Sequence, residues 1–172
     1  MLREIGLGMI FFICSAIGVA AAREMKRRIQ SLYDLQEAMM MIQGEIRYTG
    51  ATLPEAFGHV AHHAPPSCSS FFSSAGNMMN QLNHKSAKEV IQYCAEKQLK
   101  NKGLKKEDFE RLYRVGDQLG YLDREMQIKG IEFYIEQQKS ACKDAEKEYR
   151  EKERVYHYLG IIGGLFLVIL LA

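Results

Sequence analysis

The chain has few residues that interrupt helices. Its 172 residues include no tryptophan and only three prolines, Pro54, Pro65 and Pro66. β-Branched residues are scarce outside the termini, whereas Glu, Lys, Gln, Ala, Met and Leu are common in the middle of the chain. Because these residues are good helix formers, the composition predicts an all-α fold.

Cysteine is also scarce, and its spacing excludes a disulfide framework. The four cysteines, Cys14, Cys68, Cys94 and Cys142, are far apart and form no C-x-x-C motif. The pattern favours free thiols that serve as small apolar residues in a reducing compartment. A reactive cysteine is the alternative, but no neighbouring motif supports it.

Neither the net charge nor any motif indicates nucleic-acid binding or catalysis. The net charge is only +2, which gives no bulk attraction to nucleic acid. The sequence has no glycine-rich phosphate loop, no G-x-S-x-G and no H-E-x-x-H. The acidic residues between 143 and 154 alternate with basic ones at the i, i+4 spacing of a solvated helix face. We therefore expect a protein that is not an enzyme and has no cofactor, metal or small-molecule substrate; an enzyme without a recognisable motif remains an alternative.

The longest apolar runs lie at the two ends of the chain. Within residues 155–172, no charged side chain follows Tyr158. As a helix, this segment would be about 27 Å long, which is close to the roughly 30 Å hydrocarbon thickness of a bilayer. The segment predicts a C-terminal transmembrane helix, with a buried helix of a globular domain as the alternative.

The first 22 residues predict a second transmembrane helix. Ile5–Ala22 is uncharged, and basic residues follow it directly. A cleaved signal peptide is the competing interpretation, because Ala20-Ala21-Ala22 resembles a small-residue cleavage site. The long apolar run and the position of the basic cluster after it favour an uncleaved span. A lipoprotein site at Cys14 is disfavoured because Phe11-Phe12-Ile13 lacks small residues.

The basic residues also predict the topology. They cluster after the first span and before the second, so the positive-inside rule places residues 23–154 in the cytosol and both termini on the other side. Small residues mark where the two spans could pack closely in lipid. These candidate packing residues are Ala16, Ala20, Gly160 and Gly164.

Residues 23–154 predict about six helices arranged as a bundle. The first and last, 23–48 and 123–154, should run on from the membrane spans and lie antiparallel. Thr52 with Glu55 and Ser86 with Glu89 have the spacing of capping boxes. Ser67 is expected to cap the third helix and Asp123 the last. Apolar residues at spacings of three and four give every segment a buried face, including Met126 in the last helix.

Two further patterns leave alternatives open. His59, His62 and His63 lie at i, i+3 and i+4, which suits a metal site, but no further ligand or motif accompanies them, and solvent-facing histidines are favoured. Residues 85–106 contain seven lysines and two glutamates. This stretch is interpreted as a solvated face, with contact to anionic lipid headgroups or to an acidic partner as the alternatives.

Several segments together resemble a known family. They are Glu45-Ile46-Arg47-Tyr48, Thr52-Leu53-Pro54-Glu55-Ala56-Phe57, Leu119-Gly120 with Asp123-Arg124, Gln127 and Lys129, and Tyr158-Leu159-Gly160 leading into Gly163-Gly164-Leu165. Through the order and spacing of these segments, the chain resembles the stage III sporulation protein AB family of endospore-forming bacteria. The resemblance implies a two-pass protein of the mother-cell membrane around the forespore. It also implies a helical insert similar to the F-type platform domains of type II secretion and type IV pilus machines.

The resemblance further implies a non-enzymatic platform or scaffold in the mother-cell-to-forespore channel complex. Its expected partners are membrane lipid, the secretion-type ATPase of that complex (protein AA), other channel components and further copies of itself. A membrane-anchored regulatory or sensor protein that binds a cytosolic factor is the alternative. The candidate partner-contact residues are Glu45, Arg47, Tyr48, Glu55, Asp123 and Arg124. For Glu55 and Asp123, a structural role as helix caps is the favoured interpretation.

Overall fold

The part of the chain that the computed structural model describes consists of helices and the turns between them. It covers the backbone of residues 2–81, 86–120 and 123–171, without the side chains of 2–15, 17, 154 and 156–171. The elements are α1 (Leu2–Gly44), the π-helical turn η1 (Glu45–Thr49), α2 (Leu53–His63), α3 (Ser69–Gln81), α4 (Ala87–Gln98), α5 (Lys106–Leu119) and α6 (Arg124–Leu171). The all-α prediction with about six helices is confirmed.

The chain divides into two units. One comprises residues Met1–Arg27 and Asp144–Ala172, and the other comprises Arg28–Lys143. Of the first unit, the structure describes helical backbone and surface ion pairs such as Arg150–Glu146 at 3.7 Å and Lys152–Glu148 at 2.8 Å. These two pairs confirm the i, i+4 spacing expected of a solvated face. The described residues include no helix with both the length and the apolar character that a membrane crossing requires.

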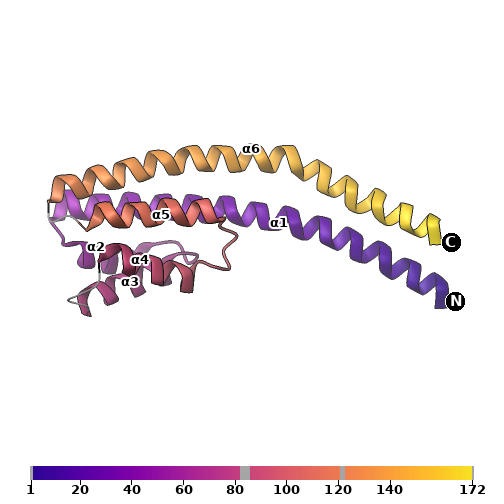
Figure 1. Ribbon diagram of the computed structural model, residues 1–172, viewed down its shortest axis with the longest axis horizontal. Coiled ribbons are helices and arrows are strands. Elements are labelled where there is room, and N and C mark those ends of the chain that lie inside the picture. The colour runs from indigo at the N-terminus through magenta and orange to yellow at the C-terminus, as the bar shows by residue number, and fades with distance from the viewer. Residues whose placement is uncertain (1, 82–85, 121–122, 172) are drawn as a thin grey trace. The chain divides into compact units, whose positions relative to one another are not determined.

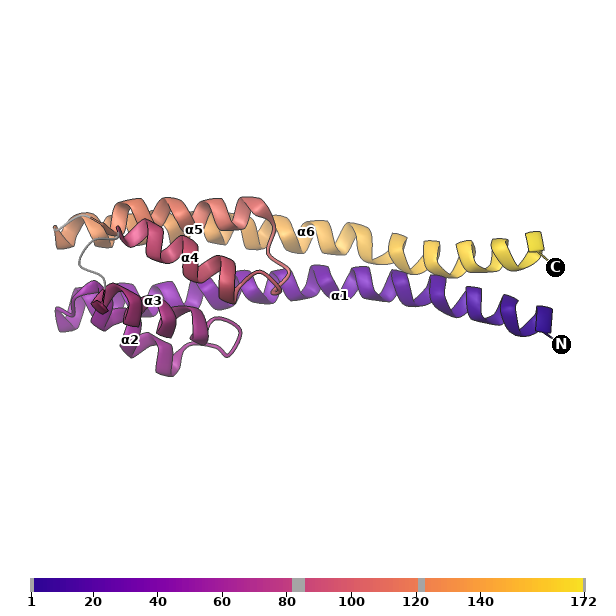
Figure 2. The ribbon, with the colours of Figure 1, turned by 60° about the horizontal axis from the view of Figure 1, so that its bottom comes forward.

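In the second unit, α1 and α6 run antiparallel. The Gln138 side-chain amide donates to the Leu32 carbonyl at 3.1 Å. Arg47, in η1 directly after α1, pairs with Glu132, earlier on α6. Contacts that advance on one helix and retreat on the other define opposite directions. Figures 1 and 2 show the shorter helices α2–α5 lying along this part of α1 and α6. The predicted antiparallel arrangement of the first and last helices is confirmed within this unit.

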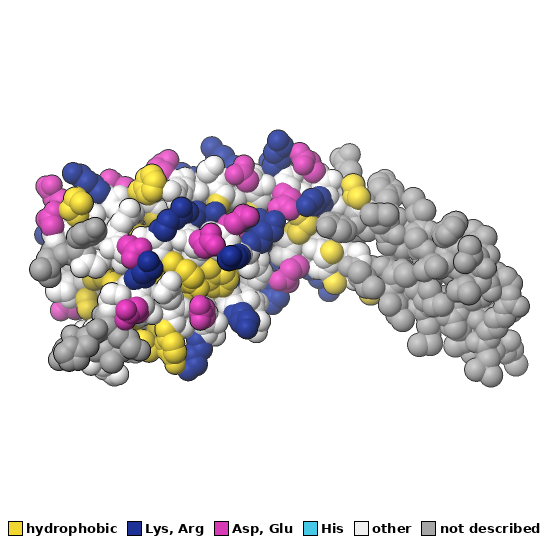
Figure 3. All heavy atoms as spheres, in the orientation of Figure 1, with side chains coloured by type: hydrophobic (Ala, Val, Ile, Leu, Met, Phe, Trp, Pro, Cys, Tyr) yellow, Lys and Arg dark blue, Asp and Glu magenta, His cyan; other side chains and the backbone are white. Residues whose placement is uncertain are grey.

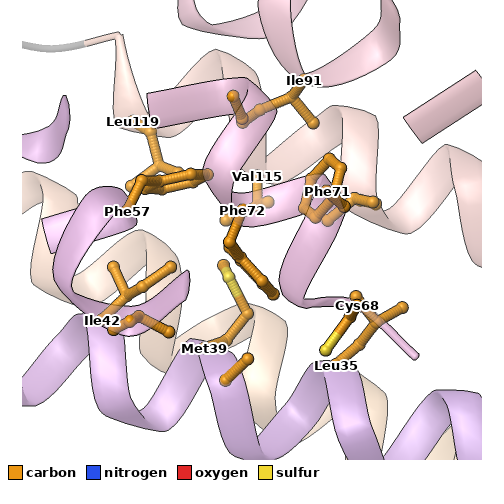
Figure 4. Close-up of a cluster of buried hydrophobic side chains, with 14 of the residues drawn as sticks. Leu35, Met39, Ile42, Phe57, Cys68, Phe71, Phe72, Ile91, Val115 and Leu119 are labelled. Atoms are coloured by element: carbon orange, nitrogen blue, oxygen red, sulfur yellow. The ribbon is translucent and has the colours of Figure 1, made fainter. Parts of the chain in front are cut away.

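The core of the second unit lies where the short helices meet α1. Phe72 is fully buried between Phe57, at a ring-centroid distance of 5.4 Å, and Phe71, at 4.8 Å. Figure 4 shows the Phe72 ring extending towards Met39 of α1, with Phe57 and Phe71 on either side of it. The side chains follow the helical spacing that the sequence predicts, because residues three or four apart share one face of a helix. This packing fixes α2 and α3 against the end of α1.

Local capping signals explain three of the helix starts. The Glu55 carboxylate accepts hydrogen bonds from the Thr52 backbone N–H at 2.9 Å and the Thr52 hydroxyl at 2.7 Å. Ser86 Oγ accepts from the Glu89 N–H at 3.3 Å. Asp123 Oδ2 accepts from the Met126 N–H, also at 3.3 Å. These bonds satisfy N–H groups that have no partner inside the helix, and they confirm the predicted starts.

Two expectations about individual residues are wrong. Ser67 does not cap α3, because its hydroxyl donates to Asp34 of α1, while the Pro65 carbonyl accepts from the N–H of Ser69. Met126 does not face the core, because its exposure is 48%. It lies seven residues before Phe133, which is also exposed, so the two share one solvent-facing side of α6.

Gly116 lets α5 approach α4 closely. A Cβ atom at this position would lie 2.8 Å from Lys88 Cα, a backbone atom that cannot rotate away. We expect Gly116→Ala to lower the free energy of unfolding by about 1–3 kcal/mol, the usual range for overpacking. Urea unfolding of the full chain in detergent, followed by circular dichroism, measures the change.

Gly58→Ala is the matched control, because a Cβ at Gly58 in α2 meets no atom within 4 Å. Alanine favours a helix over glycine by about 1 kcal/mol, so this variant should be as stable as the parent or more so. Equal stability of Gly116→Ala and the parent would contradict the close approach of the two helices.

Candidate functional site

The end of α1 is shaped by a π-helical turn that closes on a glycine. In η1 the Thr49 hydroxyl donates to the Glu45 carbonyl at 2.6 Å. Gly50 follows with φ of 74°, a left-handed conformation that glycine adopts without the Cβ penalty. The sequence predicts a helix that ends at residue 48, shortly before this glycine, but it does not predict the π-helical geometry. Single π-turns are frequent at functional sites, and this one carries three of the candidate contact residues.

Two arginines join this turn to the start of α6. Arg47 pairs with Glu132 at 2.5 Å, and Arg124 donates to the Arg47 carbonyl at 2.6 Å. The hydrogen bond with Glu132 raises the pKa of the Arg47 guanidinium above its usual value. The structure therefore brings Arg47 and Arg124, 77 residues apart in the chain, to one place on the surface.

Glu45 and Tyr48 complete this surface. Glu45 accepts from His59 Nδ1 at 3.0 Å, which links η1 to α2. Tyr48 has an exposure of 83%, the greatest among the large apolar side chains described. An isolated exposed tyrosine is ordinary, but tyrosine and arginine are also the side chains enriched at energetically important protein contacts. We call the residues Glu45, Arg47, Tyr48 and Arg124 the η1 surface.

The remaining two candidate contact residues have structural partners. Glu55 closes the capping box of α2, and the hydrogen bonds from Thr52 lower the pKa of its carboxyl group. Asp123 caps α6. Both therefore have the capping role that the sequence favours, and a role in partner contact stays a prediction for them.

A groove of about 530 Å³ lies beside the η1 surface. Its walls come from η1, the start of α2, the end of α3, the start of α4 and the junction of α5 with α6, where the family-like segments meet. The lining residues include Ile46, Leu53, Pro54, Met79, Leu119 and Arg124. Most of these side chains are apolar, which suits the binding of an apolar group with Arg124 at the rim.

The expected histidine and cysteine chemistry is limited. His59, His62 and His63 are all exposed, as the favoured interpretation states, and the described residues hold no cluster of three or more metal-ligating side chains. Cys68, Cys94 and Cys142 are free and buried. Burial raises the pKa of the Cys68 thiol to about 11, so this thiol is a poor nucleophile near neutral pH.

The predicted membrane-packing residues are only partly described. Ala16 and Ala20 lie on exposed positions of α1. The side-chain surroundings of Gly160 and Gly164 lie outside the described residues, as do those of most of the two apolar segments. The packing of the spans and the boundaries at 22 and 155 stay predictions.

A buried group of charges is the main feature that the sequence reasoning missed. Asp108, near the start of α5, is almost fully buried. It accepts from Arg28 Nε at 2.8 Å, from the Lys105 N–H at 2.8 Å and from Arg111. Burial alone would raise the pKa of Asp108, but the hydrogen bonds and the two guanidinium charges lower it below its usual range. The only sequence signal was an acidic residue in the first turn of a helix.

The geometry suits recognition of a protein surface more than bond-making chemistry. The η1 surface offers charged and aromatic side chains on helix ends, and its carboxylate, Glu45, accepts a hydrogen bond from His59. The fold belongs to the class of all-α helical bundles. Comparison with known proteins then defines the particular family.

The family model described as Stage III sporulation protein AB matches residues 3–172. A relative, Stage III sporulation protein AB of Bacillus subtilis (strain 168), is 27% identical over 171 residues, which is 99% of either chain. A solved structure of stage III sporulation protein AB has a TM-score of 0.65 and 26% identity over 72% of this chain and 97% of its own. The chain belongs to the stage III sporulation protein AB family, and its role lies in sporulation. The resemblance stated from the sequence is confirmed.

Proposed function

We propose that this protein is a non-enzymatic, membrane-anchored platform of the channel complex between mother cell and forespore, and that the η1 surface engages the secretion-type ATPase of that complex. One observation carries this proposal. Segments scattered along the sequence, from Glu45 to Arg124, converge on one end of the bundle around an exposed tyrosine. Convergence of this kind is what a docking surface requires, whereas stability alone would not need an exposed Tyr48.

The membrane part of the proposal rests on the two apolar end segments and the basic residues that flank them. By the positive-inside rule, these features support a position of residues 23–154 on the mother-cell cytosolic side, where an ATP-driven motor would act. A platform built from a single domain would then need two or more copies. The alternative function, a membrane-anchored regulator, predicts a different cytosolic partner for the same bundle.

The experiment is capture of the purified ATPase by the full chain, extracted with detergent from carbonate-washed membranes. We expect Tyr48→Ser to weaken capture by about tenfold or more, because truncating a central aromatic contact removes binding energy of about 2 kcal/mol. Tyr33→Ser is the matched control, since Tyr33 is an exposed tyrosine of α1 outside the η1 surface. This control should bind as the parent does.

A charge exchange distinguishes a role of Arg47 in binding the ATPase from a purely structural role. In Arg47→Glu combined with Glu132→Arg, the ion pair is kept with its charges reversed. If Arg47 only braces the bundle, both stability and capture will match the parent. If Arg47 contacts the ATPase, as we propose, the exchanged pair should have parental stability and reduced capture. Absence of the chain from the washed membranes would contradict the anchor, and parental capture by Tyr48→Ser and by the exchanged pair would contradict the η1 surface.

A further inference from the structure

A second groove lies between α4 and α5, on residues that the η1 surface does not use. Its volume is about 420 Å³, within the range of sites that take an apolar group. The lining residues are Tyr93, Glu96, Lys97, Lys100, Phe109 and Tyr113. In Figure 3, an apolar patch lies over the α4–α5 region with basic side chains beside it.

The floor of this α4–α5 groove is aromatic and incompletely covered. The Phe109 and Tyr113 rings lie 6.1 Å apart on one face of α5, and both residues are half-buried. Tyr93 faces the groove from α4 with 48% exposure. Burial, and secondarily the charge of Glu96, raises the pKa of Tyr113, so its ring is neutral at physiological pH. Three aromatic side chains thus line one open site.

The rim is basic. Lys97 Nζ lies 5.4 Å from the centre of the Tyr93 ring and 3.3 Å from its hydroxyl. Lys100 is exposed beside it. Among the described residues, no carboxylate lies within ion-pair distance of Lys97 or Lys100. Two lysines of α4 and α5 do have carboxylate partners, Lys88 with Asp117 at 2.9 Å and Lys106 with Glu110 at 3.6 Å.

We propose that the α4–α5 groove binds an acidic amphipathic segment of a partner protein. An apolar side chain of that segment would lie on Phe109 and Tyr113, and its carboxylates would face Lys97 and Lys100. The charge complementarity is specific to these two lysines, because neither has a carboxylate partner in the part of the chain that the structure describes. Glu96 makes the position next to Tyr113 unfavourable for a further carboxylate.

The helical form of the occupant follows from the spacing of the walls. Tyr93 and Lys97 are separated by four residues on α4, and Phe109 and Tyr113 by four on α5, so both walls repeat once per helical turn. Lys100 follows in the turn just after α4. Such a groove matches a helix that presents its own side chains with the same repeat. A lipid headgroup would satisfy the lysines but would leave the aromatic floor uncovered. The inference goes beyond the proposed function, because it names a second contact, separate from the η1 surface.

The test uses the full chain in uncharged detergent and a short fluorescein-labelled peptide of Glu and Ala that carries Phe and Leu one helical turn apart. Fluorescence anisotropy should show saturable binding. We expect Lys100→Glu and Tyr93→Ser each to weaken it on the order of tenfold, because each removes one of the two complementary features. A peptide with Ser in place of Phe and Leu should bind at least as weakly as the variants do.

Matched controls separate the groove from general electrostatics. Lys143→Glu makes the same charge change on the exposed side of α6, and Tyr33→Ser removes a tyrosine of similar exposure, 41% against 48% for Tyr93. Both should bind the peptide as the parent does, and all variants should keep the parental circular dichroism spectrum.

Three outcomes would overturn the proposal. The first is the absence of saturable binding by the parent. The second is an equal loss of binding in Lys143→Glu and Lys100→Glu, which would show that only net charge matters. The third is displacement of the peptide by short-chain phosphatidylglycerol but not by an excess of unlabelled peptide, which would identify the groove as a lipid contact.

Discussion

Replacement of Asp108 by alanine should lower the free energy of unfolding by about 3–5 kcal/mol, because it leaves two largely buried arginine side chains, 11% and 14% exposed, without their shared carboxylate. Both Asp108 oxygens accept hydrogen bonds, Oδ2 from Arg28 and the Lys105 N–H, and Oδ1 from Arg28 at 3.0 Å and from Arg111. The carboxylate thereby ties α1 to the first turn of α5, 80 residues further along the chain. Urea unfolding of the full chain in detergent measures the loss.

The effect of Asp108 should depend on pH in one direction. Its folded-state pKa is lowered, so the ionised carboxylate stabilises the fold at all pH values above the unfolded-state pKa of about 3.9. That stability is lost as the pH falls through the still lower folded-state pKa. The difference in unfolding free energy between the parent and Asp108→Asn should therefore be constant near neutrality and shrink below about pH 4.

A triple variant tests whether the charges or only their pairing matter. Arg28→Met with Asp108→Leu and Arg111→Met removes all three charges and keeps similar volumes. Replacement of a whole buried ion group by apolar residues is often neutral or stabilising, so this variant should recover most of the stability that Asp108→Ala loses. A loss below about 1 kcal/mol in Asp108→Ala, or a triple variant no more stable than the single one, would argue against the buried triad.

The sequence predicts the helices well because their signals are local. Thr52 with Glu55 and Ser86 with Glu89 lie three residues apart, so the capping bonds depend only on the chain around them. Ser67 shows the limit of this logic. Its spacing also suits a cap, yet its hydroxyl bonds to Asp34 in another helix, and only the tertiary packing determines that choice.

In the candidate site, too, the sequence predicts the local features but not the contacts between distant residues. The η1 segments were identifiable because they carry the family's pattern, and the stop at Gly50 follows from one residue. The contact of Arg124 with the Arg47 carbonyl and the burial of Asp108 join positions about 80 residues apart. Neither leaves a spacing signal in a single sequence. The α4–α5 groove was only partly indicated, since the lysines were visible but their alignment with Phe109 and Tyr113 was not.

Phe72→Ala should cost about 3–5 kcal/mol, the range for removal of a fully buried aromatic ring. Phe72 contacts both Phe57 and Phe71, and such aromatic pairs add to the loss of apolar burial. Phe133→Ala is the control, because Phe133 is 58% exposed and its loss should stay within about 0.5 kcal/mol. The same urea titration compares the two, and equal losses would contradict the packing shown in Figure 4.

The Phe72 variant also links the core to the proposed docking surface. The groove beside η1 takes walls from Leu53 and Pro54 near the start of α2 and from Met79 in α3, and Phe72 lies where these two helices pack together. Capture of the ATPase by Phe72→Ala should therefore fall with temperature in parallel with unfolding, and should match the parent at temperatures where the variant is folded. Tyr48→Ser should show the opposite behaviour, with parental stability and weak capture at every temperature. Loss of capture by fully folded Phe72→Ala would contradict the expectation that Phe72 affects capture only through the stability of the fold.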